Sequence, residues 1–350
     1  MMNIEELVAK AKADGASDVH IIVNLPPKYR KSGLLEDMDS EICTKEYCLD
    51  IARQLSGNEE AFNELMTHGE LDAAGTYAGN RCRIHLFKQQ GVPSLALRIL
   101  SEEIPELETL GLPLAVLDLP KLHKGIVLVT GETGSGKSTT LAALIDSINH
   151  TREDHIVTLE DPVEYIYKPD KCVINQREVG KDTKSFAEGL RASLREDPNV
   201  ILIGEMRDRD TIETAITAAE TGHLVFGTLH TGSASDAVDR IVQVFPADAQ
   251  TQIRLQLSMT LQAVLTQQLV PKKGGGRALA CELMIVTDAI RNLIRAGNTP
   301  QIANAVATSA QIGGQTMDMA LVRLVRGGQI TRDDALHYAK DQDYVKKNAI

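Results

Sequence analysis

The sequence predicts an α/β protein with a doubly wound, mainly parallel sheet, preceded by a smaller α+β domain. The chain has 350 residues, which is enough for two domains. Prolines and glycines gather near residues 105–125, where the sequence pattern changes. Beyond that point, short and fully apolar runs alternate with helical segments, as in parallel sheets covered on both faces. We therefore expect domains at residues 1–105 and 121–350, joined by a linker at residues 106–120.

The N-terminal part of the chain predicts a mixed α+β domain. We expect one strand at residues 19–23 and one helix at residues 44–55. Further runs of β-forming residues are broken by turn residues at 78–80 and 91–93. These runs predict strands of an antiparallel sheet at residues 71–77, 81–88 and 94–100.

The second domain is expected to alternate buried strands with helices. Strands are predicted at residues 126–129, 156–159, 200–203 and 224–228. Helices are predicted at residues 138–148, 186–195 and 211–221. The tail beyond Pro246 is expected to be mostly helical, with a hairpin-like break at residues 274–276.

Composition and charge count against several classes of protein. A formal net charge of -11 counts against a protein that binds nucleic acid. No apolar run approaches the roughly 18 residues of a membrane span, and the start of the chain lacks the apolar core of a signal peptide. The five cysteines form no C-x-x-C pair, which favours free thiols over zinc or disulfide sites. We expect a cytoplasmic protein that reaches a membrane only through partners.

Residues 131–138 carry the strongest local signal. They match the pattern G-x-x-x-x-G-K-[ST] between an apolar strand and a helix. Glycines let backbone N–H groups close around phosphate oxygens, and the helix N-terminus adds its positive end. Lys137 supplies a point charge, and Ser138 offers a hydroxyl to Mg²⁺. The sequence therefore predicts binding of ATP and Mg²⁺ by Gly131, Glu132, Thr133, Gly134, Ser135, Gly136, Lys137, Ser138 and Thr139.

Carboxylates follow two of the predicted strands. Glu160 and Asp161 come at the end of the strand at 156–159 and are candidates to hold Mg²⁺ or its water shell. A capped, solvated loop is an equal alternative for them. Glu205 follows the strand at 200–203, where it could polarise the attacking water as general base. The alternative is a strand-end carboxylate in a salt bridge with Arg207.

Two histidines bracket the strand at 224–228. His230 lies just past its carboxyl end, on the phosphate side, and could sense the γ-phosphate. His223 lies at its start, so its role as an ATP-binding residue is less direct. The alternative for both is a structural histidine with satisfied hydrogen bonds.

Phosphoryl transfer also benefits from an arginine finger, often supplied by a neighbouring subunit. The candidates are Arg81, Arg83 and Arg98. Arg81 and Arg83 alternate on one predicted strand and so face the same side. A plain solvated face would look the same.

Several segments resemble the type II secretion and type IV pilus ATPases. Residues 194–208 resemble the signature of that family, with Asn199 where an Asp is usual. Residues 160–164 and 222–230 resemble its Asp and His boxes, and residues 15–20 resemble its N-terminal opening. Glu132 departs from the family's usual Pro in the phosphate loop, which puts the turnover rate in doubt but not the site.

Two features resemble the PilT-like retraction branch of this family. Residues 289–295 read Ala-Ile-Arg-Asn-Leu-Ile-Arg, a helix with an i, i+4 pair of arginines, Arg291 and Arg295. Extension and secretion ATPases commonly carry a four-cysteine zinc insertion in the C-terminal domain, whereas beyond residue 246 this chain has only Cys281, near the turn at residues 274–276. The alternative for the helix is an ordinary surface helix.

The resemblance implies a RecA-like ATPase domain with a helical C-terminal region and a PAS-like N-terminal domain. It implies a homo-hexamer that powers pilus retraction by pulling on an inner-membrane platform protein. It further implies that Arg81, Arg83 and Arg98 reach the nucleotide. Three alternatives stay open: a pilus-assembly or secretion ATPase, a nucleic-acid motor, and a nucleotide-gated scaffold with little turnover.

Overall fold

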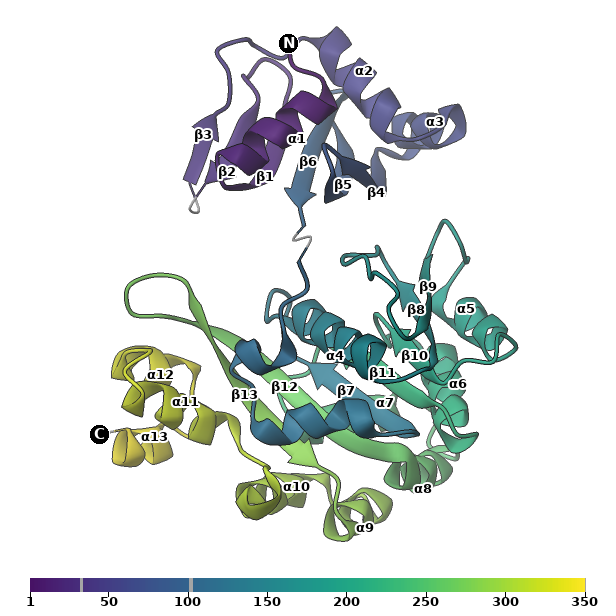
Figure 1. Ribbon diagram of the computed structural model, residues 1–350, viewed down its shortest axis with the longest axis vertical. Helices are drawn as coiled ribbons and strands as arrows, with labels where there is room; N and C mark the ends of the chain where they lie inside the picture. Colours follow the sequence, from purple (N-terminus) through teal and green to yellow (C-terminus); the bar gives the residue numbers. More distant parts are fainter. Residues whose placement is uncertain (32–33, 101–102, 350) are drawn as a thin grey trace. The chain divides into compact units, whose positions relative to one another are not determined.

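The computed structural model describes residues 1–31, 34–100 and 103–349, and the chain divides into two compact units (Figure 1). The first unit is Met1–Glu103 together with the short segment Pro162–Ile166. The second is Ile104–Asp161 and the chain from Tyr167 onward. The domain bounds predicted from the sequence remain a prediction, because compactness does not show which segments fold independently.

The first unit is built on an antiparallel sheet with strand order β3-β2-β1-β6-β5-β4. Its strands are β1 (Ala16–Ile21), β2 (Lys28–Lys31), β3 (Leu34–Asp37), β4 (Glu70–Tyr77), β5 (Asn80–Gln89) and β6 (Val92–Ile99). Its helices are α1 (Ile4–Ala13), α2 (Lys45–Leu55) and α3 (Glu59–His68), each begun by an Asn or Thr cap.

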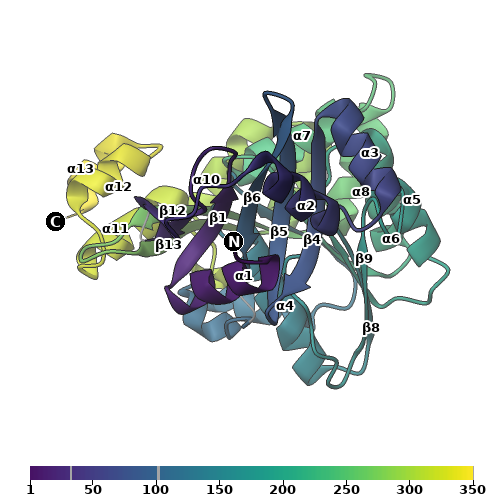
Figure 2. The ribbon, with the colours of Figure 1, turned by 90° about the horizontal axis from the view of Figure 1, so that it is seen from above.

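Buried and more exposed side chains alternate along the central strands β1 and β5 of this sheet. Val19, Leu97 and Ile84 lie opposite one another on three adjacent strands and are buried. The helices α1, α2 and α3 cover this face (Figure 2). The other face carries a row of polar residues in register across four strands: Arg30, Asp18, Arg98 and Arg83.

The second unit is built on a mainly parallel sheet with strand order β13-β12-β7-β11-β10-β8-β9. β13 runs antiparallel to β12, and the other neighbouring pairs are parallel. The strands are β7 (Gly125–Thr130), β8 (His155–Glu160), β9 (Val173–Glu178), β10 (Val200–Ile203), β11 (Leu224–Leu229), β12 (Leu261–Pro271) and β13 (Arg277–Ile285). The predicted α/β class is therefore confirmed.

Helices bury both faces of the central strands. All six residues of β7 are buried, which explains its run of apolar side chains without alternation. α6, α7 and α8 share one apolar cluster with Ile126 and Leu128 of β7. The helices of this unit are α4 (Lys137–Thr151), α5 (Phe186–Ser193), α6 (Arg209–Glu220), α7 (Ala234–Gln243), α8 (Gln250–Thr260), α9 (Asp288–Ala296), α10 (Ile302–Ala307), α11 (Met317–Arg326), α12 (Arg332–Tyr338) and α13 (Gln342–Asn348).

The expectation of a mostly helical tail beyond Pro246 is wrong in part. β12 and β13 form a long hairpin that adds to the sheet, with the turn near the predicted break at 274–276. The β12 segment contains Leu, Gln and Ala, which favour helices, but pairing with β7 prevails over that local preference. The predicted linker also contains two short 3-10 helices, η1 (Leu107–Leu110) and η2 (Leu114–Lys121).

All five cysteines are free and buried. Burial raises the pKa of Cys281 to about 12, so this thiol stays protonated at neutral pH. Within the described residues, no helix combines the length and the apolar character that crossing a membrane requires.

Candidate nucleotide site

The loop between β7 and α4 has a backbone that only glycine accommodates easily. Gly131, Gly134 and Gly136 have φ angles of 138°, 80° and 92°, all in the region that other residues avoid. A Cβ atom on Gly131 would lie 2.4 Å from the carbonyl oxygen of Gln267. The glycines of the motif are therefore required by the local fold and by a neighbouring strand.

The Lys137 ammonium and the N-terminus of α4 place positive charge beside this loop. The Lys137 ammonium donates to the carbonyl oxygens of Gly131 and Glu132 at 2.8 and 2.9 Å. Lys137 is also the first residue of the 15-residue helix α4, whose N-terminal N–H groups open toward the same place. Glu132 and Ser138 are exposed. The arrangement fits a bound chain of phosphates.

Glu160 and Asp161 differ in their surroundings. Glu160 is the last residue of β8, and its Oε1 accepts hydrogen bonds from the Thr158 hydroxyl (2.7 Å) and the Gln176 amide (3.3 Å). Asp161 is exposed, and its charge helps to raise the pKa of the Arg207 guanidinium. Of these two carboxylates, Glu160 is thus the one held by side chains of its own strand and of the neighbouring strand β9.

Glu205 is fixed by the main chain on both sides. Gly204 donates its N–H to the Leu159 carbonyl at 2.8 Å, and Met206 donates to the Thr228 carbonyl at 3.1 Å. The Thr228 hydroxyl donates to the Gly204 carbonyl. The segment 204–206 is therefore tied to both neighbouring strands, β8 and β11.

The Glu205 carboxylate meets two basic groups. Its Oε1 accepts a hydrogen bond from Arg207 Nε, and His230 Nε2 lies 3.1 Å from the same oxygen. The bond to Glu205, followed by the negative charge of that group, raises the pKa of Arg207. The salt bridge considered as an alternative is present, and His230 joins it.

The two histidines of the β11 segment lie at opposite ends of that strand. His230 follows its carboxyl end, beside Glu205. His223 precedes its amino end, where its Nδ1 lies 2.8 Å from the Ala218 carbonyl oxygen. A six-residue strand spans about 20 Å, so His223 is not brought together with the phosphate loop of this chain. Its surroundings match those of a structural histidine.

Four adjacent strands deliver the remaining candidates to one edge of the sheet. The phosphate loop follows β7, His230 follows β11, Glu205 follows β10 and Glu160 ends β8. These strands are parallel, so their carboxyl ends meet at a single edge. A glycine-rich anion loop and a carboxylate paired with histidine thus share one edge.

The three candidate arginines belong to the first unit, on β5 and β6. Arg81 and Arg83 flank the buried Cys82 and share a face, as predicted. Arg81 Nε donates to the Val163 carbonyl at 3.2 Å, and Arg98 Nε donates to Asp18 Oδ1 at 2.8 Å. Arg83 is exposed, and no hydrogen bond or ion pair holds it among the described residues.

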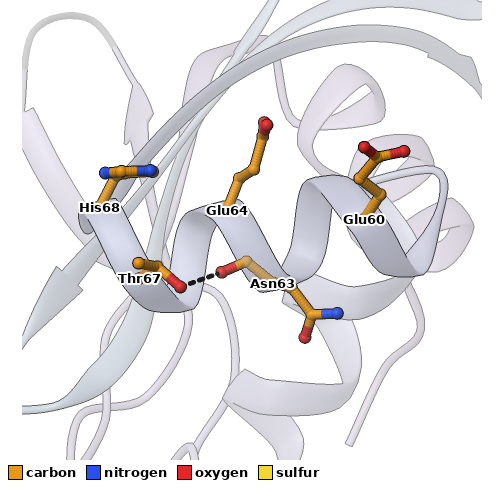
Figure 3. A pocket seen from close by; sticks show the side chains of 5 residues that line it. All are labelled: Glu60, Asn63, Glu64, Thr67 and His68. Atoms are coloured by element: carbon orange, nitrogen blue, oxygen red, sulfur yellow. Dashed lines mark hydrogen bonds between the residues drawn. The ribbon is translucent and has the colours of Figure 1, made fainter.

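A hollow of about 450 Å³ lies on α3 of the first unit (Figure 3). Its lining residues Glu60, Asn63, Glu64, Thr67 and His68 all come from that one helix. The Thr67 hydroxyl is bonded to the Asn63 carbonyl oxygen, as on an ordinary helix surface. This hollow adds no chemistry to the nucleotide site.

The structure also reveals residues that sequence reasoning missed. Thr266 and Gln267 of β12 contact the strand, loop and helix of the phosphate site. The adjacent polar residues in an otherwise apolar run were the available signal. The prediction of a helical tail concealed it.

The strand–loop–helix and its edge of carboxylates define a nucleotide-binding protein of the P-loop class. Residues 2–312 match the family model described as "Type II/IV secretion system protein", and the chain belongs to this family. The family resemblance inferred from the motifs is confirmed.

Similar proteins narrow the resemblance further. The type IV pilus retraction ATPase PilT of Pseudomonas aeruginosa is 44% identical over 342 residues, which are 97% of this chain and 98% of that protein. The uncharacterized protein YggR of Escherichia coli K12 is 44% identical over 94% of this chain and 100% of its own. A crystal structure of the pilus retraction motor PilT with bound ADP superposes with a TM-score of 0.92, at 45% identity, over 99% of this chain and 100% of that one.

Proposed function

We propose that this chain is an ATP-hydrolysing motor that powers type IV pilus retraction as a homo-hexamer. The observation that carries the proposal is Glu205, which is tied to two strands at the edge where the phosphate loop lies and is paired with His230. The PilT relative, similar over almost the whole chain, supports the same function.

The residues divide the chemistry of hydrolysis among them. The loop amides and Lys137 hold the phosphates, which positions the terminal phosphoryl group. Ser138 and Glu160, with Asp161 nearby, would hold Mg²⁺ or its water shell, and the bound ion would neutralise charge on the phosphate oxygens. Glu205 orients the attacking water and accepts its proton. His230, 3.1 Å from Glu205, orients that carboxylate and senses the terminal phosphate.

Arg83 is the best placed of the arginines to act on the nucleotide of another subunit. Arg98 is already held by Asp18, and Arg81 donates to a carbonyl oxygen. A finger must be free to reach the developing charge in the transition state. We therefore assign this role to Arg83.

The motor would work in the cytoplasm at the inner face of the membrane. Its partner there would be the inner-membrane platform protein of the pilus machine, from which pilins return to the bilayer. This part of the proposal rests on the resemblance and on the relatives' names.

The first test is steady-state ATPase activity of the purified protein with Mg²⁺, beside Glu205→Gln and Lys137→Ala. We expect slow hydrolysis by the wild type, and a loss of at least about 100-fold in kcat for Glu205→Gln. Binding of ATP, measured by calorimetry, should persist in Glu205→Gln and disappear in Lys137→Ala. A wild type that binds ATP but hydrolyses it no faster than Glu205→Gln would instead indicate a nucleotide-gated scaffold.

A further inference from the structure

β12 extends past the end of the strand that carries the phosphate loop. Thr266 of β12 is in register with Thr130, the last residue of β7, and their hydroxyl oxygens lie 2.8 Å apart. Both side chains are fully buried. The next residues of β12 therefore run alongside the loop that begins at Gly131.

Gln267 contacts both ends of that loop. Its carbonyl oxygen lies so close to Gly131 that a Cβ atom added there would be 2.4 Å from that oxygen. Its side-chain Nε2 donates to the Thr140 hydroxyl at 2.7 Å, and Thr140 lies in the first turn of α4. Gln267 is 0% exposed and Thr140 is 2% exposed. One buried residue thus links the start of the loop to the helix that ends it.

Other hydrogen bonds also hold the loop: Lys137 donates to the Gly131 and Glu132 carbonyl oxygens, and the Gly131 N–H donates to the Leu229 carbonyl oxygen at 3.3 Å. Glu132, Thr133 and Gly134 are exposed, so packing does not fix their positions. The Gln267 Oε1 and the Ser135 Oγ are buried without a hydrogen-bond partner among the described atoms. Burying an unpaired polar atom disfavours folding. An apolar residue at position 267 would avoid that cost but could not donate to the Thr140 hydroxyl, so the link across the loop requires the amide.

We propose that Gln267 is a positioning residue for the bound nucleotide. It fixes the separation between Gly131 and the first turn of α4, which carries Lys137 and Ser138. These two side chains can then meet phosphate oxygens in a preset geometry. The inference rests on the proposed function only in requiring that the site binds nucleotide.

The test removes the hydrogen bond between Gln267 and Thr140, first by changing the donor and then by changing the acceptor. Gln267→Met keeps the length of the side chain and removes the amide, and Thr140→Val removes the acceptor. We expect each to weaken ADP binding, measured by calorimetry, by about tenfold and to raise KM for ATP more than it lowers kcat. The double variant should be no worse than either single variant, because both lose one shared contact. Thr140→Ser keeps the hydroxyl and should therefore bind ADP with near wild-type affinity.

Gln268→Met is the matched control. Its side chain leaves β12 on the opposite face from Gln267, and within the described part of the chain its amide Oε1 is likewise buried without a hydrogen-bond partner. ADP affinity should be unchanged in this variant. Equal loss in Gln268→Met, or additive losses in the double variant, would overturn the proposal. If the wild type binds ADP but does not hydrolyse ATP, the motor function fails while the binding measurements still decide the role of Gln267.

Discussion

At the scale of single residues, one carboxylate oxygen of Glu205 contacts both Arg207 and His230. Arg207 is 77% exposed, and such pairs contribute little to stability, about 0–1 kcal/mol. His230 is 42% exposed and lies on the loop that follows β11. Glu205 itself is only 18% exposed and is anchored through its main chain. The carboxylate is thus the fixed member of the group, and its partners are free to adjust to a nucleotide.

This arrangement predicts that His230→Asn is a catalytic defect. Loss of the imidazole should lower kcat by about 100-fold, the low end of the range for a lost proton-transfer group, with little change in KM. His150→Asn, an exposed change near the far end of α4, should leave kcat unchanged. For His223→Asn we expect a lower melting temperature, because its ring bonds the main chain at the other end of β11. A larger loss of kcat in His223→Asn than in His230→Asn would contradict this account.

At the scale of secondary-structure elements, the two arginines of α9 have different roles. The Arg291 guanidinium donates to the carbonyl oxygens of Ser258 and Met259 at 2.7 and 3.2 Å, near the C-terminus of α8. Helix ends leave carbonyl groups unsatisfied, and a cation there also complements the helix dipole. Arg295 is exposed. The basic pair predicted from the sequence is therefore one structural arginine and one surface arginine.

Arg291→Met should destabilise the fold, whereas Arg295→Met should not. Hydrogen bonds from a charged donor contribute about 1.5–3 kcal/mol, so the free energy of unfolding in urea should fall by about that amount in Arg291→Met. The Arg295→Met variant on the same helix is the matched control. Equal urea midpoints for the two variants would show that the contacts at the end of α8 do not stabilise the fold.

At the scale of the whole molecule, the nucleotide site and the candidate fingers belong to different compact units. A finger supplied by one subunit to another would make activity a property of the ring. The exposed Arg83, in a row of polar residues on the face of the sheet opposite the helices, suits such a role.

Mixed assemblies test this assignment directly. Arg83→Ala and Glu205→Gln should each be inactive alone. When the two are co-expressed in equal amounts, about a quarter of subunit interfaces would pair an intact Glu205 with an intact Arg83 from the neighbour, so about a quarter of wild-type activity should return. Mixtures that stay inactive would place Arg83 in the same subunit as its nucleotide or outside the site. Arg98→Ala alone should keep more activity than Arg83→Ala, because Asp18 already holds Arg98.

The sequence by itself determined the α/β class, the central strands and the phosphate loop. Each depends on neighbours along the chain: unbroken apolar runs such as β7 and β10 for buried parallel strands, and glycines at 131, 134 and 136 for a backbone of positive φ. Strand direction also placed His230 on the phosphate side and left His223 at the other end.

Only the tertiary structure decided the contacts between distant segments. Residues 261–271 form a strand because they pair with the edge of β7, and the local preferences of the segment do not reveal that pairing. Gln267 and Thr140 are 127 residues apart in the chain, yet they share a hydrogen bond. Likewise, the sequence does not show that Arg291 has a structural role and Arg295 does not, because that difference depends on the end of α8 lying beside Arg291. The sequence pattern of a segment indicates the environment of that one helix or strand. The contacts of Gln267 and Arg291, in contrast, form where two elements pack together.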